Sequence, residues 1–523
     1  MSTKFNNFKK KARSFLTENK SEFILLSIIL LVGSFLRLYR ISQYMTFLGD
    51  EGRDMILIRR IFTELHPPLI GPGTSVGGMY LGPLYYYLMA IPLLIASFSP
   101  VGPSVAVALV GVATIILVWV IGRKWFSREA GLIAAALYAT SPTVIHFSRS
   151  SWNPNVMPFF ALLSVYGVWK AYREHKFGWL IVMGISFAFV LQSHYLGLIL
   201  APTLFLFWLL TFKDVKKKKN NFKMKKFLKN SLIGLLSFLG LMSPLLIFDL
   251  RHDFINSKAM IAFFTDKGDA LSLNFLKIVY SIPGIFDLIN TSLLGNKNAA
   301  VGLILSLNIA IGLTSLFVKG FTGAKKKKIS KSGPELMILI AWLAFGLIGL
   351  GIYQKEIYDH YFGFLFPVPF LLISAVISEF THGKTFFKIL GYLFVLFLLS
   401  INLMNNPFSK DPNRLLARSI HVAGVIEDNS GGEPFNLAVI ADTNYEDAYK
   451  YFLLKDGYPV VSIDSQIPGT ITDQLFVVCE LIPVEKCDPT HSPKAEVANF
   501  GWSRIVESWE VDGTMVYRLV HSI

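Results

Sequence analysis

The stretch FILLSIILLVGSFL at residues 23–36 carries no charged residue and is almost entirely apolar. Two longer runs, VAVALVGVATIILVWVI at 105–121 and LMILIAWLAFGLIGLGI at 336–352, have the same character. About 20 such residues in a helix cross the roughly 30 Å hydrocarbon core of a bilayer. Of the 523 residues, 53% are hydrophobic and 16% are charged, whereas soluble domains carry about 25% charged residues. The sequence therefore predicts an α-helical polytopic membrane protein.

The formal net charge is +15, and the basic residues gather beside the apolar runs. A basic balance is also typical of proteins that bind nucleic acid. Here the clusters flank predicted spans, as they do on the cytoplasmic side of membrane proteins, so we expect contact with anionic membrane lipids and none with nucleic acid. The clusters lie at 4–13, 213–229 and 325–331.

We expect the basic clusters to lie on the cytoplasmic side of the plasma membrane. This arrangement predicts about eleven spans and a cytoplasmic N-terminus. The apolar segment 80–98 is then expected to lie along the outer interface, because a crossing there would invert the side of the later lysine clusters. The odd number of spans leaves the C-terminus outside. The expected spans are 22–41, 104–121, 130–147, 156–172, 178–194, 196–212, 230–248, 300–318, 335–353, 361–379 and 386–403.

Residues 404–523 have a different pattern and are expected to form a small extracytoplasmic α/β domain, with 1–403 as the membrane domain. A helix is expected at 445–454 and a hairpin turn at 512–513. The two cysteines, Cys479 and Cys487, would lie in a compartment that permits a disulfide, although two unpaired thiols remain an alternative. The β-like runs are 436–441, 459–463, 475–479 and 515–520.

Clusters of polar residues fall at the outer face of this topology. Each one alone fits a hydrophilic loop or a capped helix end. Together they predict an external polar cavity, because ionisable groups at membrane depth are costly and usually serve a site or pathway. A proton relay is less favoured, since the acidic residues lie in loops and at the rim. The clusters are GDEGRD at 49–54, SRSSWNPN at 148–155, QSHY at 192–195, DLRHD at 249–253, YQKE at 353–356 and YDHY at 358–361.

The pattern LRLYR at 36–40 followed by GDE at 49–51 resembles the start of the GT-C membrane glycosyltransferases. It is similar to the protein O-mannosyltransferase, aminoarabinose transferase and bacterial dolichyl-phosphate-mannose-dependent branches. The likeness extends over roughly 22–400 and implies a GT-C-like fold of about eleven transmembrane helices with an interfacial external loop. Further matching elements are PLYYY at 83–87, GRKWF at 122–126, the segment from SP at 141–142 to SR at 148–149, and HY at 360–361 with Pro367 and Pro369.

The resemblance implies that Asp50 is the catalytic base that activates an acceptor hydroxyl, and that Glu51 supports it or binds the acceptor. The donor would be a sugar on a polyprenyl phosphate, transferred with inversion to a glycan, lipid or protein acceptor. No cofactor is expected; a divalent metal is left open but less favoured, because Asn153 and Asn155 stand where oligosaccharyltransferases carry acidic ligands. Residues expected to bind the donor phosphate or sugar are Arg149, His194, Tyr195, Arg251, Lys355, His360 and Tyr361.

Other interpretations remain at this point. Arg53 and Arg59 could instead be ion-pair partners of Asp54 and Glu64. The whole chain could be a transporter or flippase of lipid-linked sugars without transferase chemistry. A third interpretation makes 404–523 a binding module for a partner in the cell envelope.

Overall fold

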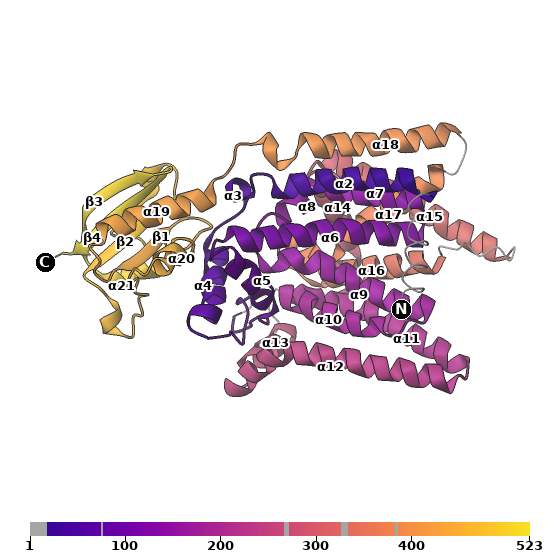
Figure 1. Cartoon of the computed structure of the whole chain (residues 1–523), viewed down its shortest axis with the longest axis horizontal. Coiled ribbons are helices and arrows are strands. Elements are labelled where there is room, and N and C mark those ends of the chain that lie inside the picture. The colour runs from indigo at the N-terminus through magenta and orange to yellow at the C-terminus, as the bar shows by residue number, and fades with distance from the viewer. Residues whose placement is uncertain (1–17, 75–76, 266–270, 326–332, 382–384, 523) are drawn as a thin grey trace, which may run out of the picture.

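The computed structural model describes residues 18–74, 77–265, 271–325, 333–381 and 385–522. Long helices lie side by side in one part of the molecule, and a small sheet with flanking helices lies at one end of this bundle (Figure 1). The helices of the bundle are α2 (Lys20–Leu38), α6 (Val101–Trp125), α7 (Arg128–Thr140), α9 (Met157–Glu174), α10 (Trp179–Ser193), α11 (Ala201–Lys217), α12 (Asn221–Arg251), α15 (Ala299–Lys325), α16 (Gly333–Ile352), α17 (Pro367–Thr381) and α18 (Thr385–Met404).

Every expected span coincides with one of these helices, which confirms the helical polytopic fold. Within the described ranges, six helices are long and apolar enough to cross a bilayer, or seven if the bent pair Asp359–Leu365 and Pro367–Glu379 is one span. The number of about eleven spans therefore stays a prediction. Two expected spans are broken by short segments: α7 is followed by α8 (Pro142–Phe147), and α17 is preceded by the 3-10 helix η3 (Asp359–Leu365).

The expected outer loops contain helices of their own. The segment 80–98 holds α5 (Leu84–Ile95), whose 12 residues extend about 18 Å, too short for the hydrocarbon core. The expected loop 249–299 is largely helical, since it contains α13 (Ile255–Thr265) and the 19-residue α14 (Phe275–Leu293). The other elements in or beside the expected outer loops are α3 (Ile41–Tyr44), α4 (Gly49–Thr63), η1 (Asn153–Val156), η2 (Tyr195–Leu200) and η4 (Pro407–Ser409).

The C-terminal part is an α/β domain with a four-stranded sheet in the order β1-β2-β4-β3. The first two strands pair in parallel, and the other neighbours are antiparallel. Its elements are α19 (Leu415–Asn429), β1 (Asn436–Ile440), α20 (Asp447–Lys455), η5 (Pro468–Thr470), β2 (Gln474–Cys479), η6 (Val484–Lys486), α21 (Ala495–Phe500), β3 (Ser503–Val511) and β4 (Thr514–His521).

Most sequence-based expectations for this domain agree with the structure. The hairpin turn joins β3 to β4, with Asp512 and Gly513 both at positive φ, 47° and 76°. The expected strand at 459–463 is wrong, because the segment makes only a single bridge, between Val460 and Phe435. That bridge leaves the segment at the margin of the sheet. The strand before the predicted hairpin turn, β3, pairs with β4 along the length of β4.

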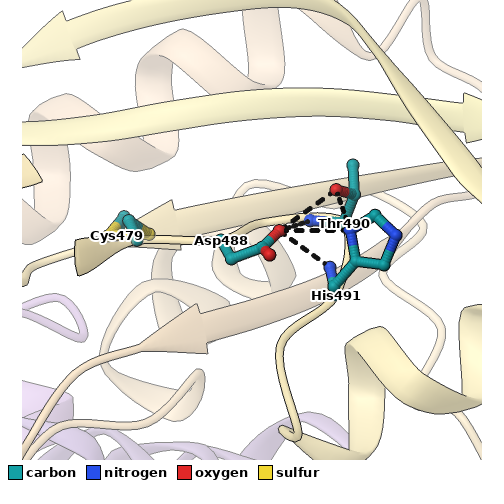
Figure 2. Close-up of a disulfide and its surroundings, with 5 residues drawn as sticks. Cys479, Asp488, Thr490 and His491 are labelled. Carbon is teal, nitrogen blue, oxygen red and sulfur yellow. Dashed lines mark hydrogen bonds and ion pairs between the residues drawn. A yellow bond between two sulfur atoms is a disulfide. The ribbon is translucent and has the colours of Figure 1, made fainter. Parts of the chain in front are cut away.

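Cys479 and Cys487 form a disulfide, with Cα atoms 6.3 Å apart (Figure 2). It closes a short loop directly after β2. Beyond it, Asp488 Oδ1 accepts hydrogen bonds from the backbone N–H of His491 (2.9 Å) and from the Thr490 hydroxyl (3.1 Å). The bond and these turns restrain the chain that leaves the end of β2.

The C-terminal domain packs on the membrane domain through α20, which lies against α4 (Figure 1). One apolar core joins the two, containing Met55 and Ile58 of α4 together with Ala448 and Phe452 of α20. This packing brings residues from the end of the chain to the beginning of α4, where Asp50 and Glu51 lie.

Candidate active site

The first turn of α4 is held from both sides. Within the turn, Glu51 Oε2 accepts a hydrogen bond from the Leu48 backbone N–H at 3.0 Å. From the C-terminal domain, Asn444 Oδ1 accepts from the Gly49 backbone N–H at 2.8 Å. Free N–H groups at a helix start are thereby satisfied, and the positive end of the helix dipole favours a carboxylate there. Asp50 is thus fixed on a rigid helix end.

Asp50 presents one held oxygen and one free oxygen. Its Oδ1 accepts hydrogen bonds from Arg53 Nη1 and from the Tyr445 hydroxyl, both at 2.8 Å. Among the residues that the structure describes, none donates to Oδ2. The side chain is 42% exposed, so water or a substrate hydroxyl can reach it. A general base needs this combination of fixed orientation and a free acceptor oxygen.

The neighbouring acids are buried and differ from Asp50. Burial raises the pKa of Glu51 to about 8, so this side chain carries a proton at neutral pH. Burial also raises the pKa of Asp54, to about 6, against the opposing effect of Arg53, whose Nη2 lies 2.8 Å from Asp54 Oδ1. Asp50 is therefore the accessible acid of this helix.

Asp50 lines two cavities. Cavity A has a volume of about 190 Å³, and cavity B has a volume of about 180 Å³. Asp50 and Trp152 are the two residues that line both cavities. Cavity A is lined by Asp50, Arg53, Pro72, Gly73, Thr74, Leu81, Trp152, Asn153, Pro154, His194, Tyr195, His360 and Tyr361. Cavity B is lined by Thr46, Leu48, Asp50, Glu51, His146, Phe147, Ser150, Trp152, Asn155, Thr443 and Tyr445.

Four of the predicted donor-binding residues meet in cavity A. The rings of His194 and His360 lie 5.8 Å apart, and His194 is 4.8 Å from the Tyr361 ring. The Trp152 ring lies 4.6 Å from His360 and links this group to the wall that both cavities share. Tyr195 stacks on His194 with ring centroids 4.6 Å apart. The cavity thus combines aromatic faces with nitrogen and hydroxyl groups that can bind a sugar or a phosphate.

Three other predicted ligands do not line either cavity. The Arg149 guanidinium is engaged elsewhere, since it donates to the carbonyl oxygens of Leu36 (2.7 Å) and Tyr39 (2.8 Å). These carbonyls lie at the C-terminal end of α2, which a cation stabilises. Arg251, at the end of α12, and Lys355, after α16, are both exposed and lie outside the two cavities.

Besides Trp152, the structure adds three residues that were not among the predicted site residues. Arg53 pairs with Asp54, as expected, and also binds Asp50 and lines cavity A. Thr443 and Tyr445 reach cavity B from the C-terminal domain. No local sequence signal marks Thr443 and Tyr445 as site residues, because the Tyr445–Asp50 contact joins residues 395 positions apart. The other expected ion pair is wrong: Glu64 binds Arg60, at 2.7 Å, and not Arg59.

Asn153 and Asn155, which lie between α8 and α9, donate hydrogen bonds to backbone carbonyl groups. Asn153 Nδ2 donates to the Ser193 carbonyl at 2.7 Å, and Asn155 Nδ2 donates to the Ser150 carbonyl at 2.8 Å. Across the described part of the chain, no group of three or more His, Cys, Asp or Glu side chains could hold a metal ion.

Comparison with known proteins defines the class of the fold. ArnT from Cupriavidus metallidurans, solved bound to undecaprenyl phosphate, matches with a TM-score of 0.60 and 11% identity, covering 95% of this chain and 97% of that one. The oligosaccharyltransferase AglB from Archaeoglobus fulgidus, solved with an inhibitory peptide and a dolichol-phosphate, matches with a TM-score of 0.53 and 14% identity, covering 90% of this chain and 70% of that one. The chain therefore has a fold similar to that of these two proteins.

Sequence comparison finds a matching family model and a distant relative. The family model "Dolichyl-phosphate-mannose-protein mannosyltransferase" matches residues 81–248. A Bacillus subtilis (strain 168) protein named "Putative mannosyltransferase YkcB" is 28% identical over 141 residues, 26% of this chain. The matched region spans only 19% of that relative's length. The shared fold and the family-model match agree with the resemblance to the GT-C superfamily that the residues around the first span indicated.

Proposed function

We propose that this protein is an integral membrane glycosyltransferase that moves a sugar from a polyprenyl-phosphate donor to an acceptor hydroxyl. The observation that carries the proposal is the position of Asp50 between two cavities, with one carboxylate oxygen held and the other free. The solved ArnT and AglB structures, which contain undecaprenyl phosphate and dolichol-phosphate, support this class of donor.

Cavity A suits the donor. Arg53, His194 and His360 bring cationic or N–H groups that can hold a phosphate oxygen as negative charge develops on it. The aromatic side chains Trp152 and Tyr361 provide faces for a sugar ring. Four of the predicted donor-binding residues, His194, Tyr195, His360 and Tyr361, line this cavity, which supports their assignment.

Cavity B suits the acceptor. It contains Glu51 as a neutral carboxyl, which can both donate and accept a hydrogen bond, and it opens beside Asp50. An acceptor hydroxyl there gives its proton to Asp50 Oδ2 while its oxygen attacks the anomeric carbon of the donor in cavity A. The bond from that carbon to the phosphate oxygen breaks, and the polyprenyl phosphate leaves with the electron pair. A single displacement of this kind inverts the anomeric carbon.

We further propose that the site faces the outside of the plasma membrane. The basic clusters favour a cytoplasmic N-terminus by the positive-inside rule, and an odd number of spans would then put the α/β domain of residues 404–523 outside. The Cys479–Cys487 disulfide supports this side, because disulfides persist in oxidising compartments.

Transfer assays with purified protein in liposomes test the proposal. Labelled polyprenyl-phosphate sugars and hydroxyl acceptors are supplied, and formation of a glycosidic bond is measured. Asp50→Asn is expected to lower transfer by about 10²–10⁴-fold, the range for loss of a general base. The matched control is Glu64→Gln, at the C-terminal end of the same helix, where the side chain is exposed and paired with Arg60. Movement of lipid-linked sugar across the bilayer without any new bond would favour a flippase instead.

A further inference from the structure

The C-terminal domain reaches the proposed base directly. The Tyr445 hydroxyl donates to Asp50 Oδ1 at 2.8 Å, and Arg53 Nη1 donates to both oxygens, at 2.8 Å to Asp50 Oδ1 and 3.2 Å to the Tyr445 oxygen. Burial raises the pKa of Tyr445, so the hydroxyl keeps its proton at neutral pH and acts as a donor. Tyr445 therefore binds the carboxylate oxygen that is not free to take a proton.

Tyr445 is itself anchored by its neighbour. Asn444 Oδ1 accepts from the backbone N–H of both Gly49 and Tyr445, at 2.8 and 2.9 Å. The Asn444 amide nitrogen donates to Glu480 Oε1, and Arg418 donates to Glu480 Oε2 at 2.9 Å. Glu480 directly follows Cys479, the disulfide-bonded end of β2. The sheet of the C-terminal domain thus fixes the position of the Asp50 partner.

The beginning of α4 is shaped to receive this segment. A Cβ atom at Gly49 would lie 2.3 Å from the Tyr445 ring, and a Cβ at Gly52 would lie 2.1 Å from the Asp447 carbonyl oxygen. A side chain at Gly49 would displace the Tyr445 ring, and one at Gly52 would displace the backbone at Asp447. Two glycines on one helix face therefore permit the close approach that the Tyr445–Asp50 hydrogen bond requires.

We propose that Tyr445 is a positioning residue for the transfer reaction: it orients Asp50 from the C-terminal domain and, with Thr443, forms a wall of the acceptor cavity. This inference rests on the proposed function. It makes the α/β domain part of the reaction site, so the domain helps to define which acceptors enter cavity B. A binding module that acts apart from the chemistry would not need this contact.

The test distinguishes a role of Tyr445 in orienting Asp50 from a role in packing the C-terminal domain on the membrane domain. It uses two variants that each lose one hydroxyl. Tyr445→Phe removes the bond to Asp50 and keeps the ring against cavity B. Tyr451→Phe removes another bond between the same domains, from the Tyr451 hydroxyl to the Phe98 carbonyl, away from both cavities. Both are measured by kcat, by KM for each substrate and by the pH profile of kcat/KM, using labelled polyprenyl-phosphate sugar and a hydroxyl acceptor.

Tyr445→Phe is expected to lower kcat by about tenfold, as for loss of one hydrogen bond to a charged group. Its acid limb should move to higher pH, because a hydrogen bond to a carboxylate favours the ionised form. Tyr451→Phe should keep the wild-type profile. Tyr445→Ala, which also removes the ring, should raise KM for the acceptor and leave KM for the donor unchanged.

Three results would overturn the inference: an unchanged profile and kcat in Tyr445→Phe, an equal change in Tyr451→Phe, or an unchanged acceptor KM in Tyr445→Ala. If the wild type transfers sugar and Asp50→Asn does not, any of these results refutes the role of Tyr445 alone. If the wild type forms no glycosidic bond, or if Asp50→Asn is fully active, the proposed function fails and the inference fails with it.

Discussion

The buried Glu51 predicts an unusual pH dependence of stability. Burial raises its pKa from an ordinary value of 4.5 to about 8. Between these values the folded protein holds a proton that the unfolded chain releases. The free energy of unfolding therefore falls as pH rises through this window, by up to about 1.4 kcal/mol per pH unit for one proton. Below pH 4.5 both states are protonated, and the contribution of Glu51 is constant.

Glu51→Gln isolates this effect. The amide keeps an oxygen that can accept from the Leu48 N–H, but it does not titrate. We expect the apparent thermal unfolding midpoint of the wild type, in detergent at pH 5, 6, 7 and 8, to fall relative to that of the variant as pH rises. Other groups, including Asp54, titrate in both proteins and cancel in the comparison. Parallel curves for the two proteins would refute the assignment of a buried, protonated Glu51.

Three further predictions follow from the site and the topology. Gly52→Ala should lower the unfolding midpoint and transfer activity, because its Cβ would lie 2.1 Å from the Asp447 carbonyl, whereas Gly424→Ala has no atom within 4 Å and should behave as wild type; equal behaviour would contradict the close approach. His194→Gln should raise KM for the polyprenyl-phosphate donor about tenfold, with acceptor KM unchanged, as steady-state kinetics would measure; a selective rise in acceptor KM would reverse the assignment of the cavities. A Ser97→Cys variant should be labelled by an impermeant thiol reagent from outside intact cells; labelling only after permeabilisation would break the predicted topology.

The helices of the bundle could be predicted because each is an apolar run bounded by charges or prolines. The same reasoning found no helix at α14, where Pro283, Asp287 and Asn290 interrupt the apolar pattern. Only one face of that helix is buried, with Ile285, Ile289 and Leu293 on it, so it never forms a continuous apolar run.

The site was partly predictable for a related reason. His194 and His360 belong to polar clusters at span ends, and topology alone puts such ends on one side of the membrane. Arg149 belongs to the same kind of cluster, but it binds the backbone carbonyls at the end of α2. The sequence does not distinguish this structural role from donor binding. The contact of Tyr445 with Asp50 could not be predicted from the sequence, because it depends on how a separate domain packs on α4.

The central claim is that Asp50 lies between a donor in cavity A and an acceptor in cavity B. Its most direct test is an experimental map of Asp50→Asn with a bound polyprenyl-phosphate sugar. We predict the phosphate beside Arg53, His194 and His360, and the anomeric carbon within about 5 Å of residue 50, which leaves room for one acceptor oxygen hydrogen-bonded to the base. A donor phosphate bound outside cavity A, with its sugar remote from residue 50, would contradict the account.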